Sequence, residues 1–490
     1  MLIATSFQLV IFVIQVILAY IAWIVFEATT ISPLKDIPGP FAAKLTQWWL
    51  IFTDLAGDRT TTIHELHKKY GPAVRIGPNE VSFANIESVK EIYGQATVYM
   101  KAPIYDTFSL PPLGIFSMRD KREHAQRRRL LAHAFSQANL YDTEPLIMKK
   151  IEKTALNIQD SNGRAINVLA LFRSLALDIV GELFLGQSFG ALDQPEPPAY
   201  LDDVDRHFLM SGIDANFPRL YKILSRLPIA AVQHFFASRQ RIYQYGHDAF
   251  FDYVKRNGRK STRKDLLTKI LVSSSSDDAP MTDEETFVEV GNLVFAGTDT
   301  TSSTLTYLFW ELARNQEWQD RLRKELSNAD MTYQSLKDLP ILDALVNEGL
   351  RLHPAAPASL QRIVPAGGGQ LGGNFIPANT IVSMQCYTTQ RDPVVFPGPD
   401  VFAPDRWLTK SGPSEEMKAL FMPFSKGTRA CLGIHLAMME LKLTTAALIR
   451  DYVVAIAENM KKSDMDMKDH FLVLPAGGKC DLVFTPRKRE

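Results

Sequence analysis

The sequence predicts one large, mainly α-helical domain with a minor β-sheet region, preceded by a single N-terminal transmembrane helix. Three observations lead to this fold class. An apolar run without charges covers residues 7–26, long helical patterns recur between residues 121 and 314, and strand signals are few and short. We therefore expect a membrane anchor at residues 1–30, a hinge at 31–40 and a globular domain at 41–490.

The N-terminal run is long enough to cross a bilayer. It reads FQLVIFVIQVILAYIAWIVF, about twenty residues without a charge. A cleaved signal peptide needs a basic start, a shorter apolar core and a small-residue cleavage site, none of which is present. A buried core helix is the alternative. Lys and Arg abound after the run, so the positive-inside rule places the rest of the chain on the cytosolic side.

Proline ends the predicted span. Pro33 and the Pro38-Gly39-Pro40 turn cannot continue a helix, because proline lacks the backbone N–H and fixes φ. We expect a stiff hinge here, between the anchor and the globule.

Beyond the hinge, helical patterns dominate. Two β-like runs at residues 73–77 and 80–84 flank Pro78-Asn79 and predict a hairpin. The form of a capping box at Thr282–Glu285 marks the start of the last long helix. The expected helices cover residues 121–134, 167–185, 231–255 and 282–314, and further strand signals lie at 380–384 and 471–474.

Composition excludes several classes of function. Fifty-four basic residues balance 54 acidic ones, so no overall charge favours nucleic acid. Three cysteines in 490 residues do not form a disulfide framework, and they lack the spacing of a zinc site. A reducing compartment is the natural inference, and the chain has no Asn-x-Ser/Thr glycosylation acceptor.

One cysteine lies in a glycine-rich loop that suits a metal-bound thiolate. The loop, Phe424 to Gly433, reads FSKGTRACLG, and a helical pattern follows Cys431. A thiolate is a strong ligand for haem iron, and it favours O–O cleavage on the opposite side. We expect Arg429 to supply a stabilising charge and the following helix to supply backbone N–H groups. Gly427 and Gly433 would allow a close approach to a flat macrocycle. A buried free cysteine is the alternative.

The long helix over residues 282–314 has a poor helical segment at its centre. Residues 296–301, AGTDTT, combine a glycine, an aspartate and three threonines within an apolar helix. We expect Gly297 to permit a local opening, Thr300 to donate to bound oxygen and Asp299 to relay protons. A small-residue seam where another helix crosses is the alternative.

Glu348 and Arg351 share one helix face, and Arg406 follows about fifty residues later. A glutamate between two arginines tolerates burial, because the charges are paired. We expect a structural clamp, whereas isolated surface pairs are the common alternative.

These motifs together resemble the cytochrome P-450 family of haem-thiolate monooxygenases, from the Pro-Gly-Pro turn to the C-terminus. The haem-binding signature is matched by Phe424, Gly427, Arg429, Cys431 and Gly433, the oxygen-activating motif by Ala296, Gly297, Asp299 and Thr300, and the Glu-x-x-Arg motif by Glu348 and Arg351, with Arg406 as third member. One departure is His124, which precedes Arg128 where many members carry Trp.

The resemblance implies the cofactor, the partners and the reaction. The cofactor is haem b with Cys431 as axial ligand, its propionates are held by His124, Arg128 and Arg362, and electrons come from NADPH through a membrane-bound reductase. The basic run at residues 121–129, with Lys426, would suit that acidic donor. The expected location of the protein is the endoplasmic reticulum membrane, with the catalytic domain facing the cytosol.

The implied reaction inserts one oxygen atom from O2 into a lipophilic small molecule, by hydroxylation or epoxidation. The chain resembles filamentous-fungal members that modify terpenoids or polyketides. A haem-thiolate isomerase or dehydratase, or a non-catalytic membrane haem protein, is the alternative. The expected pocket walls are Ile115, Phe116, Leu293, Ala296, Ala358, Ser359 and Leu472.

Overall fold

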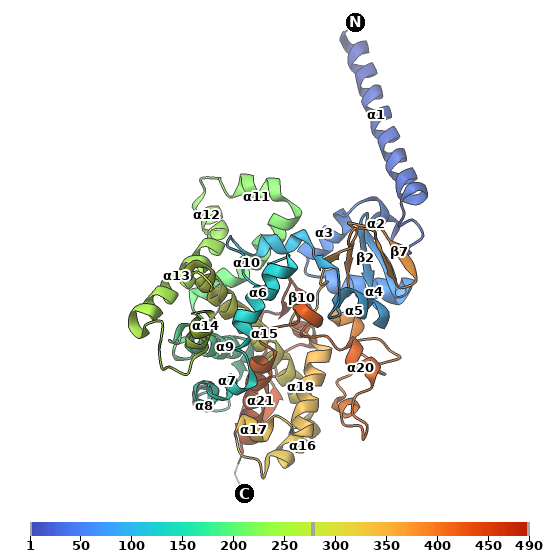
Figure 1. Ribbon diagram of the computed structural model, residues 1–490. Coiled ribbons are helices and arrows are strands. Elements are labelled where there is room, and N and C mark those ends of the chain that lie inside the picture. Colours follow the sequence, from blue (N-terminus) through green and yellow to red (C-terminus); the bar gives the residue numbers. More distant parts are fainter. Residues whose placement is uncertain (1, 276–279, 488–490) are drawn as a thin grey trace.

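The computed structural model describes residues 2–275 and 280–487. Its body is mainly helical, and helix α1 projects away from it (Figure 1). The helices are α1 (Leu2–Phe26), α2 (Phe41–Leu45), α3 (Trp48–Leu55), α4 (Arg59–Tyr70), α5 (Ile86–Tyr93), α6 (Lys121–Ala132), α7 (Gln137–Tyr141), α8 (Glu144–Asp160), α9 (Val168–Leu185), α10 (Ala199–Asn216), α11 (Pro218–Leu224), α12 (Ala230–Phe236), α13 (Ser238–Asn257), α14 (Leu266–Ser275), α15 (Asp283–Arg314), α16 (Gln316–Leu326), α17 (Tyr333–Leu336), α18 (Pro340–Leu352), α19 (Cys386–Thr389), α20 (Glu415–Leu420) and α21 (Ile434–Asp451).

The strands form small sheets beside this helical body. A five-stranded sheet has the order β1-β2-β8-β5-β3, and it includes the predicted antiparallel hairpin β1–β2. A three-stranded sheet has the order β4-β12-β9, and the pairs β6–β7 and β10–β11 are two-stranded. The predicted mainly α fold with a minor β region is confirmed. The strands are β1 (Ala73–Gly77), β2 (Glu80–Phe83), β3 (Met100–Lys101), β4 (Ile166–Asn167), β5 (Arg362–Ile363), β6 (Gly369–Leu371), β7 (Asn374–Ile376), β8 (Ile381–Ser383), β9 (Tyr452–Ile456), β10 (Met467–Asp469), β11 (Val473–Pro475) and β12 (Asp481–Pro486).

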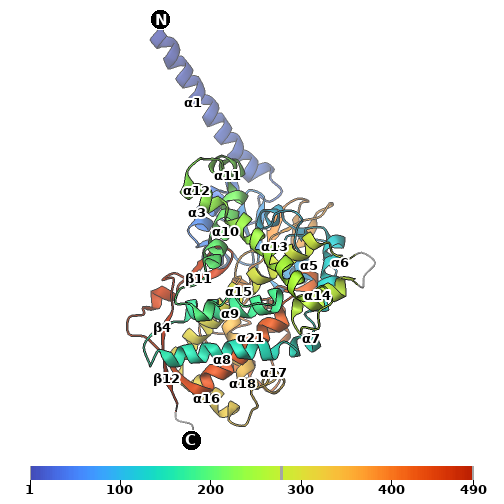
Figure 2. The same cartoon turned by 90° about the vertical axis from the view of Figure 1, so that its left-hand side faces the viewer.

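Helix α15 is the central element of the body. It lies along α9 and also packs against α13, α18 and α21 (Figure 2). The predicted capping box starts it: the Glu285 N–H donates to Thr282 Oγ1 (3.1 Å), and the Thr282 N–H donates to Glu285 Oε2 (2.9 Å). These bonds satisfy backbone donors that have no partner inside the helix.

Two predicted elements differ in the structure. The prediction of a single helix over residues 231–255 is wrong, because α12 and α13 are separate helices joined at Ala237. At this break the Ser238 hydroxyl donates to the Phe235 carbonyl (2.9 Å), a local bond that competes with a continuous helix. The strand expected at residues 471–474 begins only at Val473, because Phe471 has a φ of 85°, which an extended strand does not adopt.

The segment after α1 is fastened to the sheet. The candidate membrane span, Gln8–Ile31, has none of its most apolar stretch buried in the body. The Arg75 N–H donates to the Pro38 carbonyl (2.7 Å), and Arg75 Nη1 donates to the Ala28 carbonyl (3.2 Å). A Cβ at Gly39 would lie 2.2 Å from the Arg75 carbonyl oxygen, so this close approach requires glycine. The predicted stiff connection therefore has a physical basis in strand β1.

Candidate active site

An internal cavity of about 380 Å³ brings the separate sequence motifs together. It lies between the Cys431 loop (residues 424–433), the middle of α15 and the side chains of α6. Asp299 and Gly427 do not line it, and the clamp residues lie elsewhere. The predicted site residues that line the cavity are His124, Arg128, Ala296, Gly297, Thr300, Arg362, Phe424, Arg429, Cys431 and Gly433.

The Cys431 loop holds its sulfur toward the cavity. The Cys431 N–H donates to the Phe424 carbonyl (2.8 Å), which closes the loop. Gly427 has a φ of 64°, and a Cβ there would lie 2.0 Å from the Tyr93 carbonyl oxygen, so only glycine fits. Cys431 is exposed to the cavity and not to bulk solvent, because the surrounding protein encloses its thiol.

The charge beside this thiol comes from a different arginine than expected. Burial raises the pKa of the Cys431 thiol, while the Gly433 N–H and the Arg128 guanidinium lower it. Arg128 Nη1 is anchored on the Ala430 carbonyl (2.7 Å). Arg429 instead donates to the carbonyls of Met118 (2.7 Å) and Arg119 (2.9 Å). Arg128 therefore stabilises the thiolate, whereas Arg429 fastens the loop to the segment before α6.

Five basic side chains line one part of the cavity, and we call them the cation cluster: Lys101, His124, Arg128, Arg362 and Arg429. Lys101 was not predicted from the sequence. The pairing of β3 with β5 places Lys101 opposite Arg362, and no local pattern in the sequence indicates this contact. Lys101 Nζ donates to the Phe116 carbonyl (2.5 Å), and burial together with Arg362 and Arg429 sets its pKa well below the usual range.

The cation cluster has no ion-pair partner among the described residues. No carboxylate in residues 2–275 and 280–487 forms an ion pair with its Lys and Arg members. Burial, followed by the Arg429 and Lys101 charges, lowers the pKa of His124 to about 3, so this ring is neutral at pH 7 and has an N–H to donate. Buried cations need anionic partners. A flat dianion such as haem, with its two propionates, fits these residues and the nearby thiol.

The centre of α15 stays helical, contrary to the expected opening. Thr300 Oγ1 donates to the Ala296 carbonyl (2.7 Å), and the helix is continuous through this turn. A Cβ at Gly297 would lie 2.6 Å from Val180 Cγ1 on α9, so this glycine also allows two helices to cross closely. The Thr300 hydroxyl nevertheless lines the cavity, where it can turn toward a bound molecule.

Asp299 points away from the cavity into an ionic chain. Arg173 Nε donates to Asp299 Oδ1 (2.8 Å), and Arg173 Nη2 donates to Asp205 Oδ1 (2.6 Å). The Asp299 side chain is 4% exposed and that of Asp205 is 40% exposed, so the chain leads from the interior to the surface. The two aspartates hold the pKa of Arg173 above its usual value despite burial. Arg173 and Asp205 were not predicted.

We expect Asp299→Asn to lower kcat by roughly 100-fold, because an amide cannot accept and return a proton. The resting Soret spectrum should not change, since Asp299 does not line the cavity. The measurements are kcat and the solvent deuterium isotope effect. Thr298→Val is the matched control, because the Thr298 hydroxyl donates only to the Val294 carbonyl (2.8 Å). Wild-type kcat in Asp299→Asn would rule out a proton relay here.

The predicted clamp forms away from the cavity. Glu348 and Arg351 are fully buried, and Arg351 Nε donates to Glu348 Oε2 (2.9 Å). Arg406 Nε donates to Glu348 Oε1 (3.1 Å). Trp407 Nε1, which was not predicted, donates to Glu348 Oε2 (2.9 Å), and the Ala403 N–H donates to Oε1 (2.9 Å). This arrangement joins α18 to the segment at residues 403–407.

Aromatic side chains cover the rest of the cavity. The ring centroids of Phe108 and Phe471 are 4.8 Å apart, as are those of Phe208 and Phe295. Ala358 and Ser359 do not line the cavity, because Ser359 pairs with Gln385 in a β-bridge. Ala355 and Ala356 take that place. The predicted wall residues that do line it are Ile115, Phe116, Leu293, Ala296 and Leu472.

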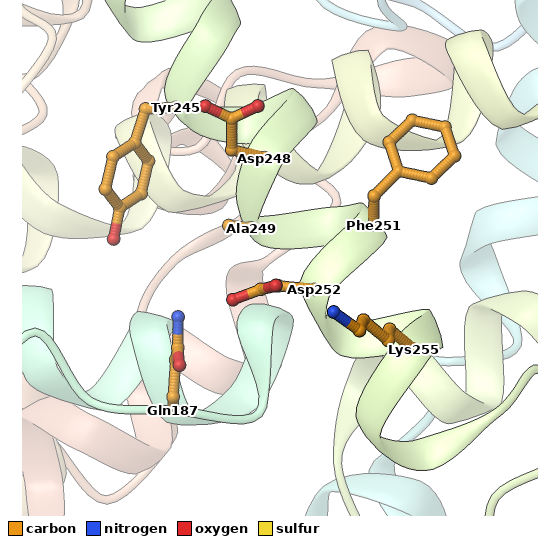
Figure 3. Close-up of a pocket in the computed structure, with 7 residues that line it drawn as sticks. All are labelled: Gln187, Tyr245, Asp248, Ala249, Phe251, Asp252 and Lys255. Atoms are coloured by element: carbon orange, nitrogen blue, oxygen red, sulfur yellow. The ribbon is translucent and has the colours of Figure 1, made fainter.

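An open cleft of about 480 Å³ lies between α13 and Gln187 (Figure 3). Its side chains come from α13, apart from Gln187, which follows α9. It contains no cysteine and none of the predicted site residues. The cleft therefore takes no part in the candidate site.

Comparisons with known proteins agree with this geometry. A family model described as Cytochrome P450 matches residues 38–482. The chain is 32% identical to the cytochrome P450 monooxygenase stcB of Emericella nidulans, over 93% of this chain and 89% of the relative. It is 33% identical to the monooxygenase tazI of Aspergillus terreus, over 92% and 93%. It is 31% identical to the monooxygenase aflV of Aspergillus parasiticus, over 94% of each.

Proposed function

Because the chain belongs to the cytochrome P450 family and is a haem-thiolate monooxygenase, we propose that its substrate is a lipophilic intermediate of fungal secondary metabolism. The reaction is a hydroxylation or an epoxidation, and the substrate is a terpenoid or polyketide. One observation carries this proposal: the Cys431 thiol and the Thr300 hydroxyl line the same cavity, whose remaining walls are mostly apolar and aromatic. Such walls favour a medium-sized apolar molecule.

The residues that line the cavity have different proposed roles. Bound haem would supply the activation of O2, and the Cys431 thiolate would hold its iron. The cation cluster would hold the two propionates, and Phe424 and Gly433, which line the same cavity, would border the ring. The Thr300 hydroxyl holds a proton on the substrate side, and Asp299, whose carboxylate Arg173 orients, exchanges protons with the surface. The aromatic side chains exclude water and orient the substrate.

Exposed basic side chains on α6 could bind an acidic electron donor. We propose that this donor is an NADPH-dependent reductase. Arg122 and Arg129 are exposed on this helix. Arg127, which the sequence placed in the same basic patch, is buried because it pairs with Glu285 and Glu289. A positive patch of this kind steers a negatively charged partner. With α1 as anchor, we propose the endoplasmic reticulum membrane, with the catalytic domain in the cytosol.

Labelled oxygen tests the proposed reaction. Membranes containing the enzyme and an NADPH-dependent reductase would be incubated with candidate terpenoids and polyketides under ¹⁸O2. We expect a product with one ¹⁸O atom, formed only when both NADPH and reductase are present. A product formed without them would contradict the proposed electron route and favour an isomerase or dehydratase.

A further inference from the structure

A polar corner interrupts the apolar wall of the cavity. Glu289 and Asn292 on α15 both line the cavity, on the N-terminal side of Thr300. Glu289 Oε2 and Asn292 Nδ2 are buried, and neither has a hydrogen-bond partner in the described part of the chain. Buried polar atoms in native proteins nearly always have a partner. These two atoms therefore indicate a missing molecule.

The two unpaired atoms border the same point. A Cβ built on Gly114 would lie 1.9 Å from Asn292 Nδ2 and 3.4 Å from Glu289 Oε2. Both atoms thus lie beside the same glycine, and a larger residue at position 114 would collide with Asn292. We call Gly114, Glu289 and Asn292 the polar corner.

The other oxygen of Glu289 is already engaged. Glu289 Oε1 accepts from the Ile115 N–H (2.8 Å) and from Arg127 Nη1 (2.7 Å). Arg127 in turn pairs with Glu285 at the start of α15. These contacts orient the carboxyl group of Glu289, a fully buried side chain, and leave Oε2 facing the corner.

We propose that the polar corner is a substrate subsite that binds a hydroxyl group. The hydroxyl oxygen accepts from Asn292 Nδ2, and its hydrogen is donated to Glu289 Oε2, so one group satisfies both atoms. The inference rests on the proposed function and narrows the substrate class to hydroxylated lipophilic molecules. An alkyl ether or a hydrocarbon of the same shape cannot supply the donor.

The position of the corner also predicts where the substrate is oxidised. Glu289 and Thr300 lie about three turns apart on one face of α15, roughly 16 Å along its axis, and Asn292 lies about 12 Å from Thr300. A molecule anchored at the corner therefore extends along the helix. Oxidation is expected at its far end, on the order of 10 Å from the anchoring hydroxyl, about the length of two linked rings.

Three biphenyl probes test the subsite in the purified holoenzyme. The probes are 4-hydroxybiphenyl, 4-methoxybiphenyl and biphenyl, and binding is read as the Kd of the Soret shift. We expect 4-hydroxybiphenyl to bind at least about 10-fold more tightly than the other two probes, because it alone pairs both buried atoms. Its oxidation should occur on the ring without the hydroxyl, mainly at the 4′ carbon.

Two variants should weaken this preference. Asn292→Leu lacks the donor, and Glu289→Gln turns the acceptor into a second donor. In each variant 4-hydroxybiphenyl keeps only one of its two bonds at the corner, so we expect its preference over the other two probes to fall by at least about 3-fold and the 4′ selectivity to fall. Glu285→Gln is the matched control. Glu285 is the second carboxylate that pairs with Arg127, and it is not part of the polar corner. This variant should still bind 4-hydroxybiphenyl more tightly than the other two probes. The Soret band of the reduced carbon monoxide adduct verifies that each variant is folded, and Asn292→Leu suffices if Glu289→Gln does not fold.

The outcomes separate the subsite from the proposed function. Equal Kd values of the wild type for all three probes would overturn the subsite, even if NADPH-dependent oxidation is observed. Such a result is expected when only a water molecule fills the polar corner. An unchanged preference in Asn292→Leu would overturn it as well. Preferential binding without NADPH-dependent oxidation of any probe would instead contradict the proposed function and leave the subsite in place.

Discussion

Replacing Cys431 with serine is expected to abolish the red-shifted Soret band of the reduced carbon monoxide adduct. The band depends on thiolate ligation, and Cys431 is the one cysteine that lines the cavity beside Thr300. We expect monooxygenase turnover to fall by more than about 100-fold, since removing even the groups behind a metal ligand costs 10- to 100-fold. The measurements are the difference spectrum and the rate of product formation.

The other cysteines provide the control for this substitution. Cys386 and Cys480 are buried, and burial raises the pKa of each thiol to about 12, so neither is a ready thiolate. Cys480→Ala should retain the red-shifted band and turnover at about the wild-type rate. A red-shifted band in Cys431→Ser would show that Cys431 is not the ligand.

Replacing Glu348 with alanine is expected to lower the free energy of unfolding by about 3–5 kcal/mol. The substitution leaves the fully buried guanidinium of Arg351 without its carboxylate partner. It also removes the hydrogen-bond acceptor of Arg406, Trp407 and the Ala403 N–H. Urea unfolding followed by circular dichroism and by loss of the Soret band measures the effect. The holoenzyme should also be recovered in much lower yield.

An exposed ion pair near the clamp gives the matched control. Asp405 accepts from Arg321 (2.9 Å), but its side chain is 68% exposed. Asp405→Asn should change the free energy of unfolding by less than about 1 kcal/mol, because solvent screens exposed pairs. A Glu348→Ala protein as stable as Asp405→Asn would contradict the structural role of the clamp.

Local contacts match the sequence-based expectations where the interacting residues are close together along the chain. The Cys431 loop, the capping box at Thr282 and the Glu348–Arg351 pair each rely on contacts within a few residues, and local backbone geometry determines such contacts. The division into anchor, hinge and domain stays a prediction, although the contacts of Arg75 support a stiff connection.

Contacts between distant segments could not be predicted in this way. Lys101 joins the cation cluster only because β3 pairs with β5, and Asp299 meets Asp205 only through Arg173 on α9. The polar corner likewise depends on the loop at Gly114 packing against α15. Each of these side chains looks like an ordinary charged or polar residue until tertiary packing gives it neighbours.

The proposed role of the cation cluster would link the folding of this protein to its cofactor supply. Without a bound dianion, Lys101, Arg362 and Arg429 repel one another in a buried space, and the folded state carries that energetic penalty. If the propionates bind here as we propose, their charge would offset this repulsion and shift the folding equilibrium toward the native state. A cell short of haem would therefore accumulate a protein that unfolds more often and is degraded sooner, so its abundance should follow the haem pool as well as the transcript.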